Sequence, residues 1–290
     1  MAVGKPWSPE RVVSVELARE LIEAQFPQLS PARVAALGEG WDNSVFSVDG
    51  EWVFRFPRRQ IAVPLIEREL RVLPALAGAL PLPVPNPELI GSGGKRFPWT
   101  FAGHRMLPGR TADQAALTVE QRSAAAAPLG RFLHALHALP LNAGPDSFDR
   151  LDAEWMRART VERLSELGIE RPRWFDDPVR KPVLRALVHG DLHARQILVD
   201  GSGAVSGVID WGDVHFGDPA CDLAIAWTFL PPPGRAAFFA AYGSVDPETW
   251  SLARLRGLHL SAALGVYAKH TSDDRLLREA LAAIDLVCTS

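Results

Sequence analysis

Two short apolar segments that each end in an aspartate constrain this chain more than any other feature. The first, Leu187-Val188, leads into the sequence HGDLHARQ, and the second, residues 207–209, leads into DWGD. Both have the length and the residue types of short buried strands, and the chain between them is long enough for a hairpin. We therefore expect Asp191 and Asp210 to lie at one end of a small sheet and to face the same cleft.

A pair of carboxylates placed in this way fits phosphoryl transfer from a nucleotide. In that reaction one carboxylate orients the attacking hydroxyl and accepts its proton, and a second holds Mg²⁺ against the phosphates. A single aspartate would carry little weight, because aspartates are common in turns and helix caps. Here Asp191 is followed five positions later by Gln196, whose side chain offers an amide oxygen. The pattern therefore indicates a site for a nucleotide and its metal ion.

The longer pattern extends this pair to HGDLHARQIL, then GVIDWGD, then GDPACDLA. It resembles the aminoglycoside phosphotransferase family, whose members are related to the protein kinases and include macrolide kinases. The resemblance extends over roughly residues 37–230. It implies an α+β, protein-kinase-like fold with a small β-rich N-terminal lobe and a larger, mainly helical C-terminal lobe. It also implies Mg²⁺ as the cofactor and ATP or GTP as the phosphate donor.

The resemblance gives the residues of the catalytic loop their expected roles. Asp191 is the catalytic base, and Asp210 is the ligand of Mg²⁺. Gln196 stands where most of the family has asparagine. It keeps the amide oxygen but adds a methylene, so its share in metal binding stays open.

Each residue near the two aspartates can be interpreted either as structural or as functional. For His189 we favour a buried ring that hydrogen-bonds the backbone of the loop, whereas His193 is an even choice between structure and contact with the γ-phosphate. Asp218 and Asp222 more readily brace the loop or cap the next helix than touch a substrate. Asp213 and Asp218 are nevertheless held as candidates for binding the acceptor.

The N-terminal part carries the pattern of a phosphate-covering loop followed by a hairpin. The loop is GEGWDNS at 38–44; with two glycines it is neither a Walker motif nor a full glycine-rich kinase loop, and by itself it would be an ordinary turn. Within the resemblance, Ser44 donates to a phosphate. Residues 45–48 and 52–56 alternate like strands, and Asp49-Gly50 between them is a strong hairpin signal.

A nucleotide site of this type also needs a cation on the third strand and a glutamate that orients it. Arg55 occupies the place where most relatives have lysine, and its planar fork can hold phosphate oxygens bidentately. A solvated strand charge is the alternative for Arg55, with Arg58 as the replacement cation. Glu69, in the helix expected around 66–76, is the best-placed partner, and Glu67 faces another side of that helix.

The segment MLPGR at 106–110 marks a change in composition and is expected to be a linker. We place a nucleotide-binding lobe at 1–105, a catalytic and acceptor-binding lobe at 106–290, and the hinge near 104–109. By resemblance, the backbone groups of Arg105 and Leu107 contact the purine. Helices are expected over 12–26, starting at Ser8, and as one long run from Gln121 to Leu139.

Bulk properties set the remaining expectations. The chain has 290 residues, a formal net charge of −3 and two cysteines, Cys221 and Cys288. Neither a basic field for nucleic acid, nor a disulfide framework, nor a run of about 18 apolar residues is present in the sequence. Together with an N-terminus that lacks an apolar leader segment, this favours a cytoplasmic monomer with no nucleic-acid or membrane partner.

The acceptor is expected to be the hydroxyl of a small molecule. Residues 142–182 hold nine acidic and eight basic residues, so bulk charge does not choose between a cationic and an apolar acceptor. The paired acids Asp176-Asp177 and Asp273-Asp274, together with Asp213 and Asp218, favour an aminoglycoside, with a macrolide as the next choice.

Two further functions stay open at this point. One is a metabolic kinase acting on a sugar, an amino alcohol or an amino acid. The other is a catalytically degenerate nucleotide-binding module, supported only by the unusual Arg55 and Gln196 and opposed by the intact Asp191 and Asp210.

Overall fold

The chain divides into two compact units, and the computed structural model describes residues 8–289 of it. The first unit comprises residues 1–78 and 84–107, and the second comprises 79–83 and 108–290. The division thus falls two residues after the boundary expected from the sequence, and the short segment 79–83 goes with the second unit. The first seven residues, part of the segment in which we expected no leader, lie outside the described residues.

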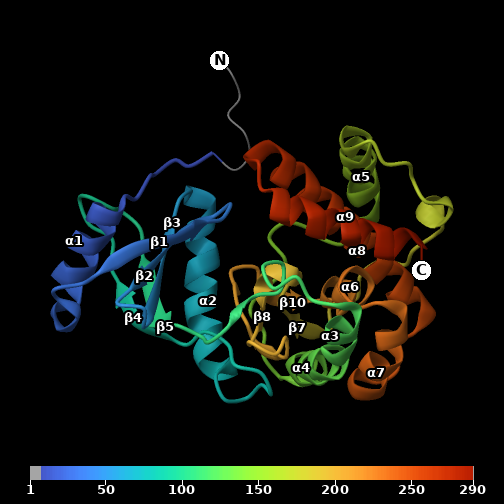
Figure 1. Ribbon diagram of the computed structural model, residues 1–290, viewed down its shortest axis with the longest axis horizontal. Helices are drawn as coiled ribbons and strands as arrows, with labels where there is room; N and C mark the ends of the chain where they lie inside the picture. The colour runs from blue at the N-terminus through green and yellow to red at the C-terminus, as the bar shows by residue number, and fades with distance from the viewer. Residues whose placement is uncertain (1–7, 290) are drawn as a thin grey trace. The chain divides into compact units, whose positions relative to one another are not determined.

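The first unit is a five-stranded antiparallel sheet with two helices. Its elements are α1 (Val15–Gln25), β1 (Val34–Glu39), β2 (Asn43–Val48), β3 (Trp52–Pro57), α2 (Val63–Leu76), β4 (Pro87–Gly91) and β5 (Phe101–Arg105). The strand order is β1-β2-β3-β5-β4, and Figure 1 shows α1 and α2 on opposite sides of the sheet. The hairpin expected at Asp49-Gly50 is confirmed: both residues have positive φ, and Val48 pairs with Trp52.

Aromatic side chains fill the space between α1 and the sheet. Phe56 stacks on Phe101 with ring centroids 4.5 Å apart, and Phe54 is fully buried among them. Helix α1 begins at Val15, because the Ser14 hydroxyl accepts a hydrogen bond from the Leu17 N–H. The expected start at Ser8 was wrong: the backbone just after it is used elsewhere, with the N–H groups of residues 10 and 11 donating to the carbonyl of residue 58.

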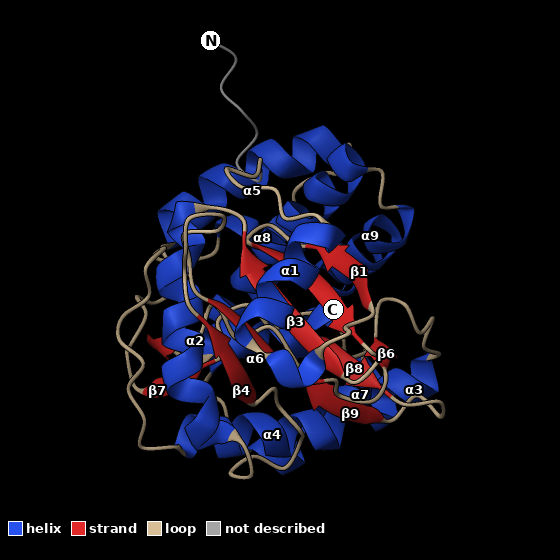
Figure 2. Ribbon diagram, turned by 90° about the vertical axis from the view of Figure 1, so that its left-hand side faces the viewer, coloured by secondary structure: helices blue, strands red, loops and turns tan. Residues whose placement is uncertain are grey.

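The second unit is mainly helical, as Figure 2 shows by its colours. Its helices are α3 (Val119–Ala124), α4 (Ala126–Ala138), α5 (Ala153–Leu167), α6 (Ala220–Thr228), α7 (Pro232–Tyr242), α8 (Pro247–Thr271) and α9 (Asp274–Thr289). Its strands are β6 (Arg110–Thr111), β7 (Ala186–Val188), β8 (Ile197–Val199), β9 (Val205–Val208) and β10 (His215–Gly217). Among residues 8–289, no helix has the length and apolar character needed to cross a membrane.

The strands of the second unit form two small sheets rather than one. Strand β7, which precedes Asp191, pairs with β10, whereas β9, which precedes Asp210, pairs with β8 in the order β6-β8-β9. The expectation that both aspartates follow strands of a single sheet is therefore wrong. Val188 is paired with His215 across the β7–β10 ladder, so the strand before Asp191 takes its partner from the chain after Asp210.

The expected long helix from Gln121 to Leu139 is two helices, α3 and α4, which meet at Ala125. Pro128 explains the break, because it has no N–H to donate to the carbonyl of Ala124. Helix α4 packs closely on α7: a Cβ at Gly130 would lie 2.6 Å from the carbonyl oxygen of Phe238.

Candidate active site

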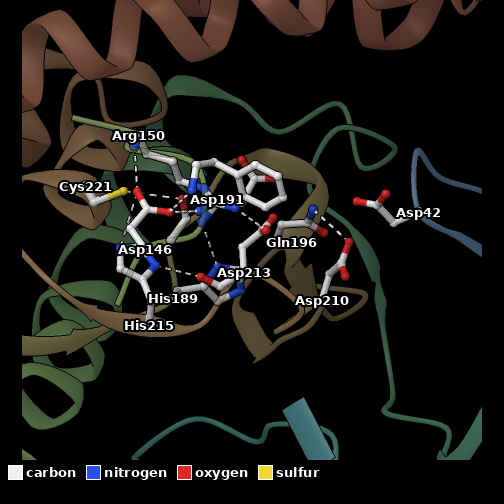
Figure 3. A network of polar contacts seen from close by, with 12 residues as sticks. Asp42, Asp146, Arg150, His189, Asp191, Gln196, Asp210, Asp213, His215 and Cys221 are labelled. Carbon is white, nitrogen blue, oxygen red and sulfur yellow. Dashed lines mark hydrogen bonds and ion pairs between the residues drawn. The ribbon is translucent and has the colours of Figure 1, made fainter. Parts of the chain in front are cut away.

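Asp191 lies in the loop that follows β7 and is surrounded by cationic or hydrogen-bonding side chains (Figure 3). Its Oδ2 is 3.5 Å from Nε2 of His193, and its Oδ1 is 3.7 Å from Nη2 of Arg256. The Asp191 side chain is 28% exposed, so it can be reached from solvent while its neighbours are buried. A carboxylate in this position can accept the hydrogen bond of an incoming hydroxyl.

The surroundings keep Asp191 in its charged form. Burial by itself would raise the pKa of this carboxyl, but the hydrogen bond and charge of His193 and the charges of Arg256 and Arg150 outweigh it. The pKa of Asp191 is therefore below its ordinary value. At neutral pH the group is a carboxylate, as an acceptor for a substrate hydroxyl must be.

Asp222, at the start of α6, holds the backbone of the loop. Its carboxylate accepts hydrogen bonds from the N–H groups of His189 at 2.7 Å and Gly190 at 2.9 Å, and it lies 3.1 Å from Nε2 of His137. Gly190 has a φ of 89°, and a Cβ there would lie 2.3 Å from the carbonyl oxygen of Asp213. Both constraints fix the peptide immediately before Asp191.

His189 has the structural role expected for it. Its Nδ1 accepts from the N–H of Asp191 at 3.3 Å, and its Nε2 donates to the carbonyl of Ile209 at 3.0 Å. Cys221 is a packing residue, as expected, and burial raises the pKa of its thiol to about 12. The ring of His189 thus connects the segment that carries Asp191 to the segment that carries Asp210.

Gln196 lies between His193 and Asp210. Its Nε2 is 3.3 Å from Oδ2 of Asp210 and 3.2 Å from Nε2 of His193. Asp210 is exposed and has a φ of 63°, a backbone conformation that costs a non-glycine residue free energy and is often found at functional sites. The structure thus brings Asp191, His193, Gln196 and Asp210 together in a row.

The oxygen donors in this row suit an Mg²⁺ ion that takes its remaining ligands from phosphate groups and water. Mg²⁺ is usually held by one or two carboxylates together with phosphate oxygens and water. Asp210 would supply one carboxylate. Gln196 presents its amide nitrogen to that carboxylate, so its oxygen would join the same metal ion only after the amide turns. Among residues 8–289, no group of three or more His, Cys, Asp or Glu side chains could hold a metal ion, so phosphate or water oxygens would have to complete the coordination of an ion bound here.

Asp213 and Asp218, the candidates for acceptor binding, are both ion-paired. Arg150 forms ion pairs with Asp213 and with Asp146 (Figure 3). Arg180 donates two hydrogen bonds to Asp218, at 2.6 and 3.1 Å. Asp218 also accepts from the N–H groups of residues 183 and 220 and is almost fully buried. Its geometry is that of a brace at the start of α6.

Sequence reasoning did not find Arg150, Arg180 or Arg256, which supply the cations of this network. Arg150 lies 63 residues from Asp213 in the sequence, and Arg180 lies 38 residues from Asp218. Each of these arginines is one of many in the chain, and no local pattern distinguishes it. Only the tertiary contacts could have identified them.

In the first unit, Arg55 and Glu69 form an ion pair. Their side chains are 10% and 5% exposed, whereas Glu67 is exposed. The burial of Arg55 excludes the alternative of a solvated strand charge. A paired strand cation and helix glutamate is the arrangement that a kinase uses to hold the phosphates of its nucleotide.

The structure does not bring Ser44 together with Arg55. Ser44 pairs with Phe56 in the β2–β3 ladder, and its side chain is buried, whereas Arg55 lies one position away and points to the other face of the sheet. The loop before Ser44 is tied to the end of β3. Arg58 donates to the carbonyl of Gly40 at 2.8 Å, and Arg59 forms an ion pair with Asp42.

Arg105 and Leu107 lie at the end of the first unit. The guanidinium of Arg105 bonds Glu51 at 2.8 Å and lies 4.0 Å above the ring of Trp52. The Arg105 carbonyl already accepts a hydrogen bond, at 2.8 Å, from Nδ1 of His104. Leu107 is the last residue of this unit.

Comparison with known proteins identifies the family. The model of the phosphotransferase enzyme family matches residues 33–258, well over half of the chain. The chain belongs to the phosphotransferase enzyme family. It is a phosphotransferase with an alcohol group as acceptor, as the sequence predicted.

Three proteins have sequences similar to that of this chain. The phosphotransferase is 27% identical to the uncharacterized protein YcbJ of Bacillus subtilis over 228 residues, 69% of this chain and 70% of that protein. It is 34% identical to viomycin phosphotransferase of Streptomyces vinaceus over 33% of this chain and 34% of that protein. It is 35% identical to aminoglycoside 3′-phosphotransferase of Streptomyces fradiae, over 37% and 44%.

Solved structures share the fold of this phosphotransferase. Aminoglycoside 2′-phosphotransferase-IIIa in complex with GDP superposes with a TM-score of 0.69 at 23% identity, covering 95% of this chain and 99% of that chain. Macrolide 2′-phosphotransferase type I gives a TM-score of 0.57 at 24% identity, with coverage of 94% and 98%. The predicted α+β, kinase-like fold class is confirmed.

Proposed function

We propose that this phosphotransferase moves the γ-phosphoryl group of ATP or GTP to a hydroxyl of a small antibiotic molecule, with Asp191 as the catalytic base. The observation that carries the proposal is the row Asp191–His193–Gln196–Asp210, in which two side chains connect a charged, accessible carboxylate to a second, exposed one. One carboxylate then receives the hydroxyl proton while the other faces the donor phosphates.

Each residue of the row has a distinct task in this proposal. Asp191 accepts the hydrogen bond of the acceptor hydroxyl and orients its oxygen toward the γ-phosphorus. Asp210 and the Gln196 amide would hold Mg²⁺, which supplies charge neutralisation of the phosphates when it is bound. His193 lies between Asp191 and Gln196, where its ring can also contact a phosphate oxygen.

On the nucleotide side, Arg55 is the proposed phosphate cation, and Glu69 orients it. The pair is buried against the sheet, so the guanidinium has a fixed direction before the nucleotide arrives. Arg105 and Leu107 are the proposed backbone contacts of the purine. Ser44 takes no part in the proposed phosphate contacts, because its side chain is buried on the opposite face of the sheet and its backbone is paired with Phe56 in the β2–β3 ladder.

An aminoglycoside is the first proposed acceptor, because a relative at 35% identity carries that name. A macrolide is the second candidate, and a specific observation favours it. The carboxylates that were expected to attract a polycation, Asp213 and Asp218, are already paired with Arg150 and Arg180. An ammonium group would have to displace these arginines, whereas an uncharged acceptor would not.

The test is a phosphorylation screen over aminoglycosides, macrolides and small metabolites, with ATP and GTP in parallel. We expect Mg²⁺-dependent transfer to one class, and a loss of at least about 10²-fold in turnover for Asp191→Ala with little change in nucleotide affinity. Turnover of the variant close to that of the wild type would exclude Asp191 as the base. Nucleotide binding without transfer or Mg²⁺-dependent hydrolysis would support the degenerate module instead.

A further inference from the structure

Arg256 reaches Asp191 from helix α8, more than sixty positions away in the sequence. Its Nη2 donates to the carbonyl of Gly190 at 3.2 Å and lies 3.7 Å from Oδ1 of Asp191. The Arg256 side chain is 6% exposed, so it contacts the carboxylate from the interior of the second unit. It does not reach the surface through which a substrate would approach.

Apart from the contact with Asp191, the surroundings of Arg256 are unfavourable for a positive charge. Its Nε is buried and has no hydrogen-bond partner within residues 8–289. The nearby ionisable groups include Arg163, whose pKa burial lowers to about 10, with the charge of Arg256 adding to that shift. His259, one turn further along α8, is buried and its pKa is well below the ordinary value. Burying a guanidinium in this way costs several kcal/mol unless an anion compensates it.

Within the described part of the chain, the carboxylate in ion-pair distance of Arg256 is that of Asp191. The other charged or titratable groups that face Asp191 are His193, in its own loop, and Arg150, which precedes α5. Arg150 is already compensated by Asp146 and Asp213. Of the two arginines beside Asp191, Arg256 is therefore the one that depends on Asp191 for compensation of its charge.

We propose that Arg256 is a positioning residue for phosphoryl transfer, which holds the Asp191 carboxylate and the Gly190 carbonyl in place and keeps the carboxylate charged. The inference rests on the proposed function of Asp191 as the base. The Arg256 fork bonds the peptide oxygen immediately before the base and attracts the base itself, so it fixes both the rotamer and the charge of that group.

The primary experiment measures the titration of the Asp191 carboxyl directly, without any substrate. Protein labelled with ¹³C at the aspartate carboxyls is titrated by NMR, and the Asp191 signal is assigned by its loss in Asp191→Asn. In Arg256→Met, which keeps the length of the side chain and removes the charge, we expect the Asp191 pKa to rise by about one unit. Arg256→Gln is the second uncharged variant, in case the first does not fold, and Arg256→Lys should keep the pKa near that of the wild type.

Kinetics provide the second readout. In Arg256→Met the turnover number for Mg²⁺-dependent ATP or GTP hydrolysis should fall about tenfold or more, because the base is no longer fixed. The KM for the nucleotide should stay within about twofold of the wild-type value, because it depends on binding of the phosphates and not on the orientation of the base. The acidic limb of the pH profile should move upward together with the Asp191 pKa.

Arg254→Met is the matched control on the same helix. Arg254 lies over the rings of Trp174 and Trp227 and takes no part in the row of site residues. The control should lower thermal stability while leaving the Asp191 pKa and the acidic limb unchanged.

An Asp191 pKa that is the same in the wild type, Arg256→Met and Arg256→Gln would overturn the inference. Full activity of Asp191→Asn would instead refute the proposed base, even with a raised pKa in the Arg256 variants. The two failures are thus distinguishable.

Discussion

Several buried charges among residues 8–289 occur as pairs, or as carboxylates that accept several N–H donors. Arg55–Glu69 in the first unit and Arg180–Asp218 in the second are of the first type, and Asp222 is of the second. Such groups gain little stability over an apolar core, but removal of one partner leaves an uncompensated charge. Single substitutions at these positions should therefore have large and readable effects.

Arg55→Ala should lower the free energy of unfolding by about 3 kcal/mol and raise the KM for the nucleotide, because Glu69 would remain as a buried, unpaired charge. Arg55→Lys should restore part of both. Chemical denaturation and steady-state kinetics measure the two effects. The control is Arg33→Ala, which breaks the exposed pair with Asp49 and should change little. Wild-type behaviour of both Arg55 variants would mean that another residue holds the phosphates.

Asp210→Asn should weaken the Mg²⁺ dependence of turnover, because a neutral amide is a poorer ligand for a hard cation than a carboxylate. Gln196→Asn should be tolerated, since the amide oxygen remains and only a methylene is lost. A Mg²⁺ titration of nucleotide hydrolysis tests both variants. Unchanged Mg²⁺ dependence in Asp210→Asn would remove Asp210 from the metal site, and loss of activity in Gln196→Asn would do the same for Gln196.

At the scale of elements, local signals and tertiary packing compete within α4. Gly130 lies in the interior of this helix, where alanine would be preferred by about 1 kcal/mol on propensity alone. The close approach of α7 leaves no space for a Cβ, because Phe238 O and the Ala241 Cβ would lie 2.6 and 3.0 Å away. Packing therefore decides which residue this position accepts.

Gly130→Ala should accordingly destabilise the protein by about 2 kcal/mol, in the range of overpacked core substitutions, despite the gain in helix propensity. The measurement is the midpoint of thermal or denaturant unfolding. Gly201→Ala is the control, because an added Cβ there meets no atom within 4 Å. If Gly130→Ala were as stable as the wild type, α4 and α7 would have to separate readily.

At the scale of the whole molecule, each unit contains at least one buried histidine whose pKa burial lowers. Burial lowers the pKa of His104 in the first unit to about 4, and burial also lowers the pKa of His215 in the second. The carboxyls of Asp218 and Asp222 also have lowered pKa values, because their hydrogen-bond and charge partners outweigh burial. All four groups bind fewer protons in the folded chain than in the unfolded one.

Stability should therefore fall as the pH falls, first through the histidines and then through the carboxylates. Between about pH 6.5 and pH 4 the unfolded chain protonates His104 while the folded chain does not, and this accounts for about 3 kcal/mol. The lowered pKa of His215 acts in the same direction. Below about pH 4 the loss continues through the aspartates. Denaturant unfolding across this range measures the slope. His104→Gln should flatten the upper part, and an unchanged slope would contradict the assignment.

Several features could be predicted from the sequence because they depend on neighbours along the chain. The Asp49-Gly50 turn needs two left-handed residues, and the sequence supplies the residues that adopt them. The pairing of Glu69 rather than Glu67 with Arg55 follows from helix periodicity. The loop around Asp191, with its flanking strands and the role of His189, was also predicted, since its pattern is continuous over a few residues.

Tertiary structure alone decided the features that depend on distant partners. Strand β7 takes its partner from the chain after Asp210, which no local pattern specifies. Asp213 and Asp218 are candidates for acceptor binding in the sequence but are ion-paired in the fold, because Arg150 and Arg180 come from segments far away. The same holds for Arg256. Hydrogen bonds and ion pairs act over a few ångströms in space, and a sequence states only which side chains exist to form them.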